Sequence, residues 1–309
     1  MTFSSLPGVA DLHVLTGAQA GPVPDLLIEV PHGATRTADF EALEAQLHGP
    51  RPDGLIDFFY VNTDVGAPEL AHTVAELLVV LDPRRSVLVL SSRIPRTFID
   101  CNRVLDAPPE FYKQGGVTPG VPPYLRDPAD LALLRDLHGR YNAVTRAAYD
   151  AICGSGGRAL MLHSYAPRSV DVHVDDQIVP SLRRAYLPEI EPTWPLRPQL
   201  DVIARDNEGQ LTIPASLADA LVDGYAAIGL KAEVGTTYPL HPSTSAWHYA
   251  QRYPGQTVCL EVRRDLLADP FSPFVEMNIS PDHVARLAPP LTDALLGWLG
   301  PSRGASQGS

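Results

Sequence analysis

Residues 86–91 read Ser-Val-Leu-Val-Leu-Ser, a short and almost continuously apolar run. Such a run is typical of a strand that is covered on both faces, as in a parallel sheet with helices on either side. Comparable runs predict further strands at residues 25–30, 55–61, 158–163, 232–234 and 256–262. These strands are expected to form the centre of the fold.

Segments with a helical spacing of apolar residues lie between these runs. The longest begins at Asp127-Pro128, where aspartate suits a helix cap and proline suits the first helical position. Helices are predicted over residues 67–80, 127–153, 215–228, 245–253 and 281–299. Strands that alternate with helices predict an α/β fold, a three-layer sandwich around a mixed, largely parallel central sheet.

The chain is long enough to bury a large core, since it has 309 residues of which 45% are hydrophobic. We find no internal repeat and no clear linker, so we expect a single α/β domain over residues 1–299. Residues 300–309 are small and polar and are expected to form a disordered tail. Residues 104–126 are rich in proline and glycine, and we expect a long ordered loop that forms a lid or a wall of a site.

Charge and cysteine content narrow the class of protein. The formal net charge of −12 argues against nucleic acids and anionic membranes as partners. The three cysteines are too few and too far apart for a disulfide framework or a thiolate zinc cluster. We see no leader-like segment and no run of about 18 apolar residues. We therefore expect a cytoplasmic protein and infer no obligate protein partner.

Four polar side chains lie near the ends of predicted strands. His32, Asp64 and His163 come at or just after strand ends, where ligands bind in open α/β sheets. Glu261 lies inside the last strand, where a carboxylate is costly unless it is paired or functional. Two imidazoles, one carboxylate and a water are the ligand set of a catalytic zinc ion. A free carboxylate nearby could accept a proton from that water.

Each of these side chains also has a structural interpretation. Either histidine could be an ordinary loop or core residue, because the spacing between them is too long for a self-contained metal motif. Asp64 could simply cap the helix that follows it. Glu261 could form an ion pair with Arg263 or Arg264.

An arginine-containing segment follows the strand at residues 86–91. Residues 92–103 read Ser-Arg-Ile-Pro-Arg-Thr-Phe-Ile-Asp-Cys-Asn-Arg. Arginine beside asparagine can bind a carboxylate while Asp100 holds the arginine in place. The segment could equally be an exposed loop with solvated charges.

Several short motifs, taken in order, resemble those of N-formylglutamate amidohydrolases. They are Pro31-His32-Gly33, Thr63-Asp64, Ser92-Arg93 with Asp100-Cys-Asn-Arg103, His163-Ser164 and Leu260-Glu261. The resemblance implies a fold like that of the zinc-dependent exopeptidases. It also implies hydrolysis of an amide bond next to a carboxylate, with N-formyl-L-glutamate giving formate and L-glutamate.

The resemblance assigns roles to the residues of these motifs. His32, Asp64 and His163 would hold one Zn²⁺ ion per chain, and Glu261 would be the general base. The chain departs from the family pattern in places: Met161 stands two residues before the second histidine, where the family often has aspartate. A hydrogen-bond partner for His163 would therefore have to come from elsewhere.

Five further residues are candidates for contact with a substrate. By resemblance, Asn102 and Arg103 would bind the substrate carboxylate, and Arg93 would bind a second carboxylate or polarise the scissile carbonyl. Arg168 follows the second histidine in its predicted loop, and His248 lies in a predicted helix. The expected substrate is a small N-acyl amino acid. The alternatives are a carboxypeptidase-like or other N-acyl amino-acid hydrolase and a non-catalytic binding protein on the same fold.

Overall fold

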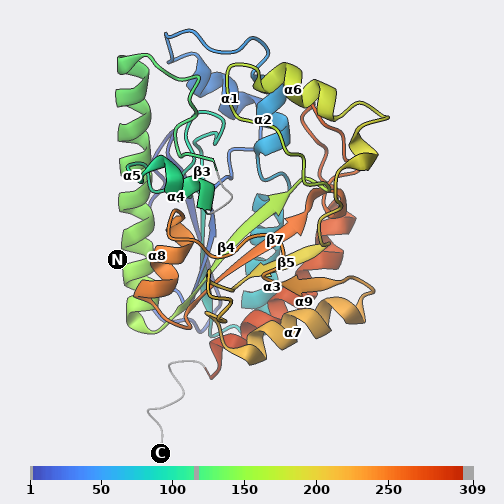
Figure 1. Cartoon of the computed structure of the whole chain (residues 1–309). Helices are drawn as coiled ribbons and strands as arrows, with labels where there is room; N and C mark the ends of the chain where they lie inside the picture. Colours follow the sequence, from blue (N-terminus) through green and yellow to red (C-terminus); the bar gives the residue numbers. More distant parts are fainter. Residues whose placement is uncertain (1–2, 115–117, 302–309) are drawn as a thin grey trace, which may run out of the picture.

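The computed structural model describes residues 3–114 and 118–301, and this part of the chain forms a seven-stranded mixed sheet with helices on both faces (Figure 1). The strands are β1 (Ala10–Thr16), β2 (Leu26–Val30), β3 (Ser86–Ser92), β4 (Arg158–Tyr165), β5 (Leu200–Ile203), β6 (Ala232–Val234) and β7 (Thr257–Arg263). The helices are α1 (Thr37–Glu44), α2 (Ile56–Asn62), α3 (Ala67–Leu81), α4 (Pro109–Gln114), α5 (Pro128–Ile152), α6 (Ile178–Ala185), α7 (Ala215–Ala227), α8 (Ser245–Arg252) and α9 (Pro281–Leu299).

The order of strands across the sheet is β1-β3-β2-β4-β7-β5-β6. The four central strands, β3, β2, β4 and β7, are mutually parallel. β1 and β5 pair antiparallel with the outer two of these four. The predicted α/β fold with a mixed, largely parallel sheet is therefore confirmed.

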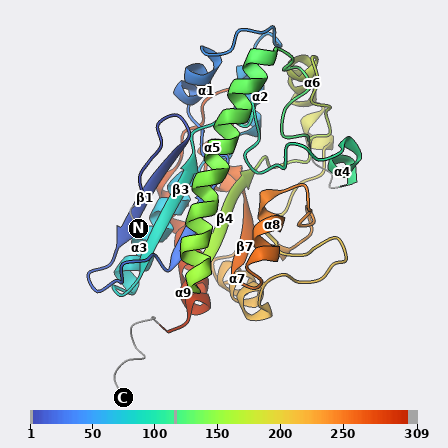
Figure 2. The ribbon, with the colours of Figure 1, turned by 90° about the vertical axis from the view of Figure 1, so that its left-hand side faces the viewer.

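Two hydrophobic cores explain the three layers. Val87 and Val89 of β3 belong to the core that α3, α7 and α9 cover, whereas Leu88 and Leu90 belong to the opposite core, which α5 covers. Figure 2 shows α5 running along the near face of the sheet. Side chains of a strand point alternately to its two faces, so a strand between two helical layers must be apolar throughout.

One predicted strand is wrong. Residues 55–61 lie mostly in the helix α2, where Phe58, Phe59 and Val61 are buried. A short apolar run fits a buried strand and a buried helix equally well, and periodicity alone does not separate them. Packing decides in favour of the helix, because this segment contacts α1 and α6 instead of pairing with a strand.

The expectations for the loop at 104–126 and for the tail fall partly on residues 115–117 and 302–309, which lie outside the described residues. The described part of the loop contains the short helix α4. None of the helices in residues 3–114 and 118–301 combines the length and the apolar character that a membrane span requires.

Candidate active site

The candidate site lies at the carboxyl ends of the central parallel strands. His32 follows β2 by two residues, and His163 of β4 is in register with Glu261 of β7. Parallel strands end at the same edge of a sheet, so side chains from residues 32, 163 and 261 meet there. Folding therefore brings together groups that are more than two hundred residues apart in the sequence.

Asp64 reaches this edge from the turn between α2 and α3. Thr63 ends α2, and its hydroxyl donates to the carbonyl of Ala34, 2.7 Å away. Gly66 begins α3 with a φ of 81°, a left-handed conformation that glycine adopts without steric cost. A Cβ atom on Gly66 would lie 2.6 Å from the Cβ of Leu267. This close approach fixes the turn that carries Asp64.

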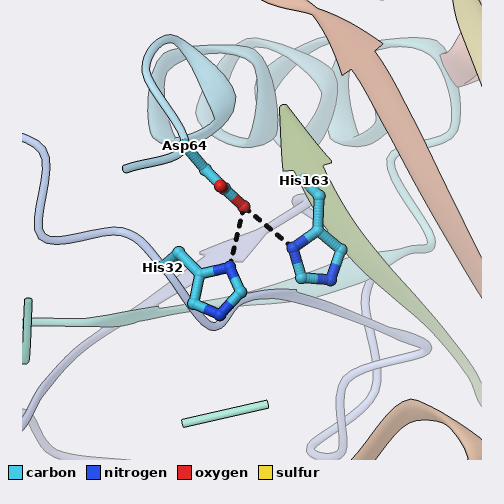
Figure 3. A group of neighbouring side chains, drawn as sticks. All are labelled: His32, Asp64 and His163. Carbon is cyan, nitrogen blue, oxygen red and sulfur yellow. Dashed lines mark hydrogen bonds and ion pairs between the residues drawn. The ribbon is translucent and has the colours of Figure 1, made fainter. Parts of the chain in front are cut away.

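Two imidazoles converge on one carboxylate oxygen (Figure 3). The Oδ2 atom of Asp64 lies 3.0 Å from Nδ1 of His32 and 2.8 Å from Nδ1 of His163. All three side chains are buried, and each offers a ligand atom that lies within 4.8 Å of the other two. Burial alone disfavours the charged carboxylate, but the two neighbouring histidines hold the pKa of Asp64 well below its ordinary value. Asp64 is therefore ionised.

The second nitrogen of each histidine also has a neighbour. Nε2 of His32 lies 2.7 Å from Oδ1 of Asp100, an arrangement that orients metal-binding histidines in proteins. Nε2 of His163 lies 3.5 Å from Nδ2 of Asn102. The Nε2 atom of His32 thus has a carboxylate neighbour, whereas the Nε2 atom of His163 has an amide neighbour.

Glu261 is a half-buried residue of β7 with one fully buried carboxylate oxygen. Its Oε2 atom has no hydrogen-bond partner among the described residues. Asp201, its neighbour in register on β5, is fully buried but accepts from the backbone of Thr236 and Thr237. Burial raises the pKa of Glu261 above its ordinary value of 4.5.

The ion pairs considered for Glu261 are absent from the described residues. Arg263 pairs with Asp265 at 2.7 Å. Arg264 donates to the carbonyls of Val61 and Ser164 and lies 3.6 Å from Asp64. A structural ion pair therefore does not account for this carboxyl group in the strand.

A cavity of about 310 Å³ opens onto these groups. This volume falls at the lower end of the range for small-molecule sites. The lining includes Asp100 and Glu261 as its acidic residues and five arginines, namely Arg96, Arg103, Arg168, Arg197 and Arg264. The local excess of positive charge contrasts with the net charge of the chain, −12, and suits an anionic ligand.

Three of the predicted substrate-binding residues line this cavity. Asn102 accepts from the backbone of Ala246 at 3.3 Å. Arg103 donates to the carbonyl of Thr118 at 3.2 Å, so the described end of the 104–126 loop forms part of the wall. Arg168 donates to the carbonyl of Trp194 at 2.7 Å.

Two predicted residues lie elsewhere. Arg93 forms an ion pair with Asp39 and is not among the residues that line the cavity. His248 is exposed on α8 and lies 2.9 Å from the carbonyl of Pro242, again outside the lining. The structure therefore does not bring Arg93 and His248 to the cavity together with the other predicted site residues.

Arg96 and Arg197 were not assigned a role from the sequence. Arg96 lies three residues beyond Arg93, and its Nη2 is 2.9 Å from Asp100 while its Nη1 is 3.6 Å from Asp64. Arg197 lies over the rings of Tyr165 and Tyr238 at 5.1 and 5.8 Å. Arg96 lies in the arginine-containing segment 92–103, so the sequence offered a reason to consider it. No sequence pattern pointed to Arg197.

Comparison with known proteins places the chain in a family. The family model for N-formylglutamate amidohydrolase matches residues 24–268. The chain belongs to this family. It is therefore a hydrolase of an amide bond, and the family resemblance expected from the motifs is confirmed. No curated protein matches the chain.

One solved structure supports the fold, and two further ones are more distantly similar. An N-formylglutamate amidohydrolase from Ralstonia eutropha is 16% identical, with a TM-score of 0.55 over 93% of this chain and 96% of that chain. A gene product of Agrobacterium tumefaciens is 17% identical, with a TM-score of 0.47 over 96% of this chain and 98% of that one. A succinylglutamate desuccinalase from Vibrio parahaemolyticus is 12% identical, with a TM-score of 0.38 over 94% and 75% of the two chains.

Proposed function

We propose that this amidohydrolase is zinc-dependent and hydrolyses small N-acyl amino acids, including N-formyl-L-glutamate to formate and L-glutamate. The observation that carries the proposal is the position of Glu261 beside the His32–Asp64–His163 cluster, with its buried Oε2 atom lacking a hydrogen bond among the described residues. A carboxyl group in this position is suited to move a proton to and from a group bound in the cavity.

The three-residue cluster fits a divalent metal ion. Its donors are two imidazole nitrogens and one ionised carboxylate oxygen, which is the donor set of catalytic zinc sites. The carboxylate of Asp100 on the far nitrogen of His32 strengthens this fit. A zinc ion, when bound, would make a water more acidic and polarise the scissile carbonyl.

Glu261 would act as the base and then as the acid. It accepts a proton from the attacking water as the bond between the water oxygen and the acyl carbon forms. It then donates that proton to the leaving nitrogen as the carbon–nitrogen bond breaks. Its raised pKa suits both steps, because the proton is held more tightly than on an exposed glutamate and is still released.

The arginines would orient the substrate and stabilise charge. Arg96, which lies beside both Asp64 and Asp100, is placed to stabilise the negative charge that develops on the carbonyl oxygen. Arg103, Asn102 and Arg168 line the same cavity and would bind the carboxylate of the amino acid.

The proposal is tested by assaying the zinc-loaded protein on N-formyl-L-glutamate and a panel of other N-acyl amino acids. Release of the free amino acid from at least one substrate, lost on chelation and restored by zinc, is the expected result. Binding of the panel without release of any amine would contradict it and favour a binding protein on the same fold.

A further inference from the structure

One side of the cavity is apolar, and a single extended segment forms much of it. Residues 170–174 follow β4 and its loop, with Val170, Val172 and Val174 half-buried against the cavity. The residues between them, Asp171 and His173, are exposed. This alternation turns three branched hydrocarbon side chains inward and the polar ones outward.

Two helices complete this side. Phe58 and Val61 of α2 and Ile178 and Leu182 of α6 also line the cavity. All four belong to one hydrophobic cluster, against which the three valines pack. We call these seven residues the apolar wall. It is continuous with the part of the cavity that holds His32, His163 and Glu261.

N-formyl-L-glutamate does not match this wall. Its acyl group is a single carbon, and its side chain ends in a carboxylate. A carboxylate against hydrocarbon loses its hydration without gaining a partner, which is unfavourable. The arginines of the cavity offer partners for carboxylates, but the wall itself contributes only apolar side chains.

We infer that the apolar wall binds a hydrocarbon group of the substrate, and that the preferred substrates are N-acyl amino acids carrying such a group. The inference rests on the proposed amidohydrolase function. The hydrocarbon is either the acyl chain or the amino-acid side chain. Each methylene added in an apolar pocket is worth about tenfold or more in kcat/KM.

The experiment compares three substrates on the zinc-loaded protein. N-formyl-L-leucine presents an apolar side chain, N-hexanoyl-L-glutamate presents an apolar acyl chain, and N-formyl-L-glutamate presents neither. We expect kcat/KM to be at least about tenfold higher for one of the first two. The preferred compound then tells which part of the substrate contacts the wall.

A pair of variants ties the preference to the wall. Val172→Asn places an amide in the wall, and His173→Asn places the same side chain on the exposed face of the same segment. The ratio of kcat/KM between the preferred apolar substrate and N-formyl-L-glutamate should fall about tenfold in the first variant and stay constant in the second.

The outcomes separate the two proposals. Faster hydrolysis of N-formyl-L-glutamate than of both apolar substrates would overturn the inference and leave the amidohydrolase function intact. An unchanged ratio in Val172→Asn would also overturn it. No hydrolysis of any of the three would overturn the proposed function and the inference with it.

Discussion

Glu261 illustrates what a single residue reveals in the sequence and what it does not. A glutamate inside an apolar strand indicates either a partner or a function, and the sequence leaves both open. The structure removes the arginine partners and leaves Oε2 without a hydrogen bond among the described residues. The charged residue within an apolar run identified Glu261 as a candidate. Its surroundings became visible only in the folded chain.

Replacing this carboxyl group should separate turnover from metal binding. Glu261→Gln is expected to lower kcat by roughly 10²- to 10⁴-fold, because the amide cannot accept the proton of the attacking water. Bound zinc per chain should stay at the wild-type level. Glu208→Gln, which alters an exposed glutamate, serves as the control. Wild-type kcat in Glu261→Gln would show that another group is the base.

The acid limb of the pH profile should report the same group. Hydrolysis needs ionised Glu261, and burial raises its pKa above the ordinary 4.5. As the pH falls through this raised pKa, the carboxylate is protonated and kcat/KM decreases. The decrease should therefore begin at a higher pH than an exposed glutamate would give. A kcat/KM that stays constant down to pH 4.5 would contradict this assignment.

Arg93 and Arg96, both in the 92–103 segment, should differ in their effect on kcat. Arg96→Ala is expected to lower kcat by roughly 10²- to 10³-fold, the usual result of removing a group that stabilises an oxyanion. Arg93→Ala should leave kcat within about twofold, since Arg93 pairs with Asp39 outside the cavity. The reverse ranking in steady-state assays would restore the sequence-based assignment of Arg93.

At the scale of elements, the predicted strands that were confirmed are those with predominantly apolar runs. β1 and β5 were not predicted: β1 is a half-exposed edge strand with polar Asp11 and His13, and β5 is a short run interrupted by Asp201. The Asp127 cap of α5 was predicted, and its carboxylate accepts from the backbone of Ala129 and Asp130. The strand predicted at residues 55–61 was wrong because tertiary packing decides the structure of so short a run.

The turn between α2 and α3 should depend on a glycine. Gly66→Ala adds a Cβ atom 2.6 Å from Leu267, while Gly156→Ala meets the same positive φ with open space around it. Gly66→Ala should therefore cost about 1–3 kcal/mol more in the free energy of unfolding than Gly156→Ala. It should also weaken zinc binding, because Asp64 moves with the turn.

Chemical denaturation and zinc titration of the two glycine variants provide the measurement. Equal losses of stability would mean that the backbone conformation alone matters at residue 66. Equal zinc affinity in the two variants would mean that the position of Asp64 does not depend on this turn.

For the whole molecule, the sequence predicted which residues meet but not how the cavity around them is built. His32 and His163 were expected to converge because parallel strands end at one edge of a sheet. Asp64 was expected at such a strand end too, but it reaches the edge from the turn between α2 and α3. Arg197 and the apolar wall come from loops and helices whose positions depend on packing between distant segments. Such contacts leave no periodic signal in the sequence.

The most direct test of the account is the amount of zinc bound per chain, measured by plasma mass spectrometry after dialysis against limiting zinc. The wild type and His48→Ala, which alters an exposed histidine, should each retain about one ion per chain, and His32→Ala should retain almost none. Retention of the wild-type amount by His32→Ala would contradict the proposal that His32, Asp64 and His163 hold the metal.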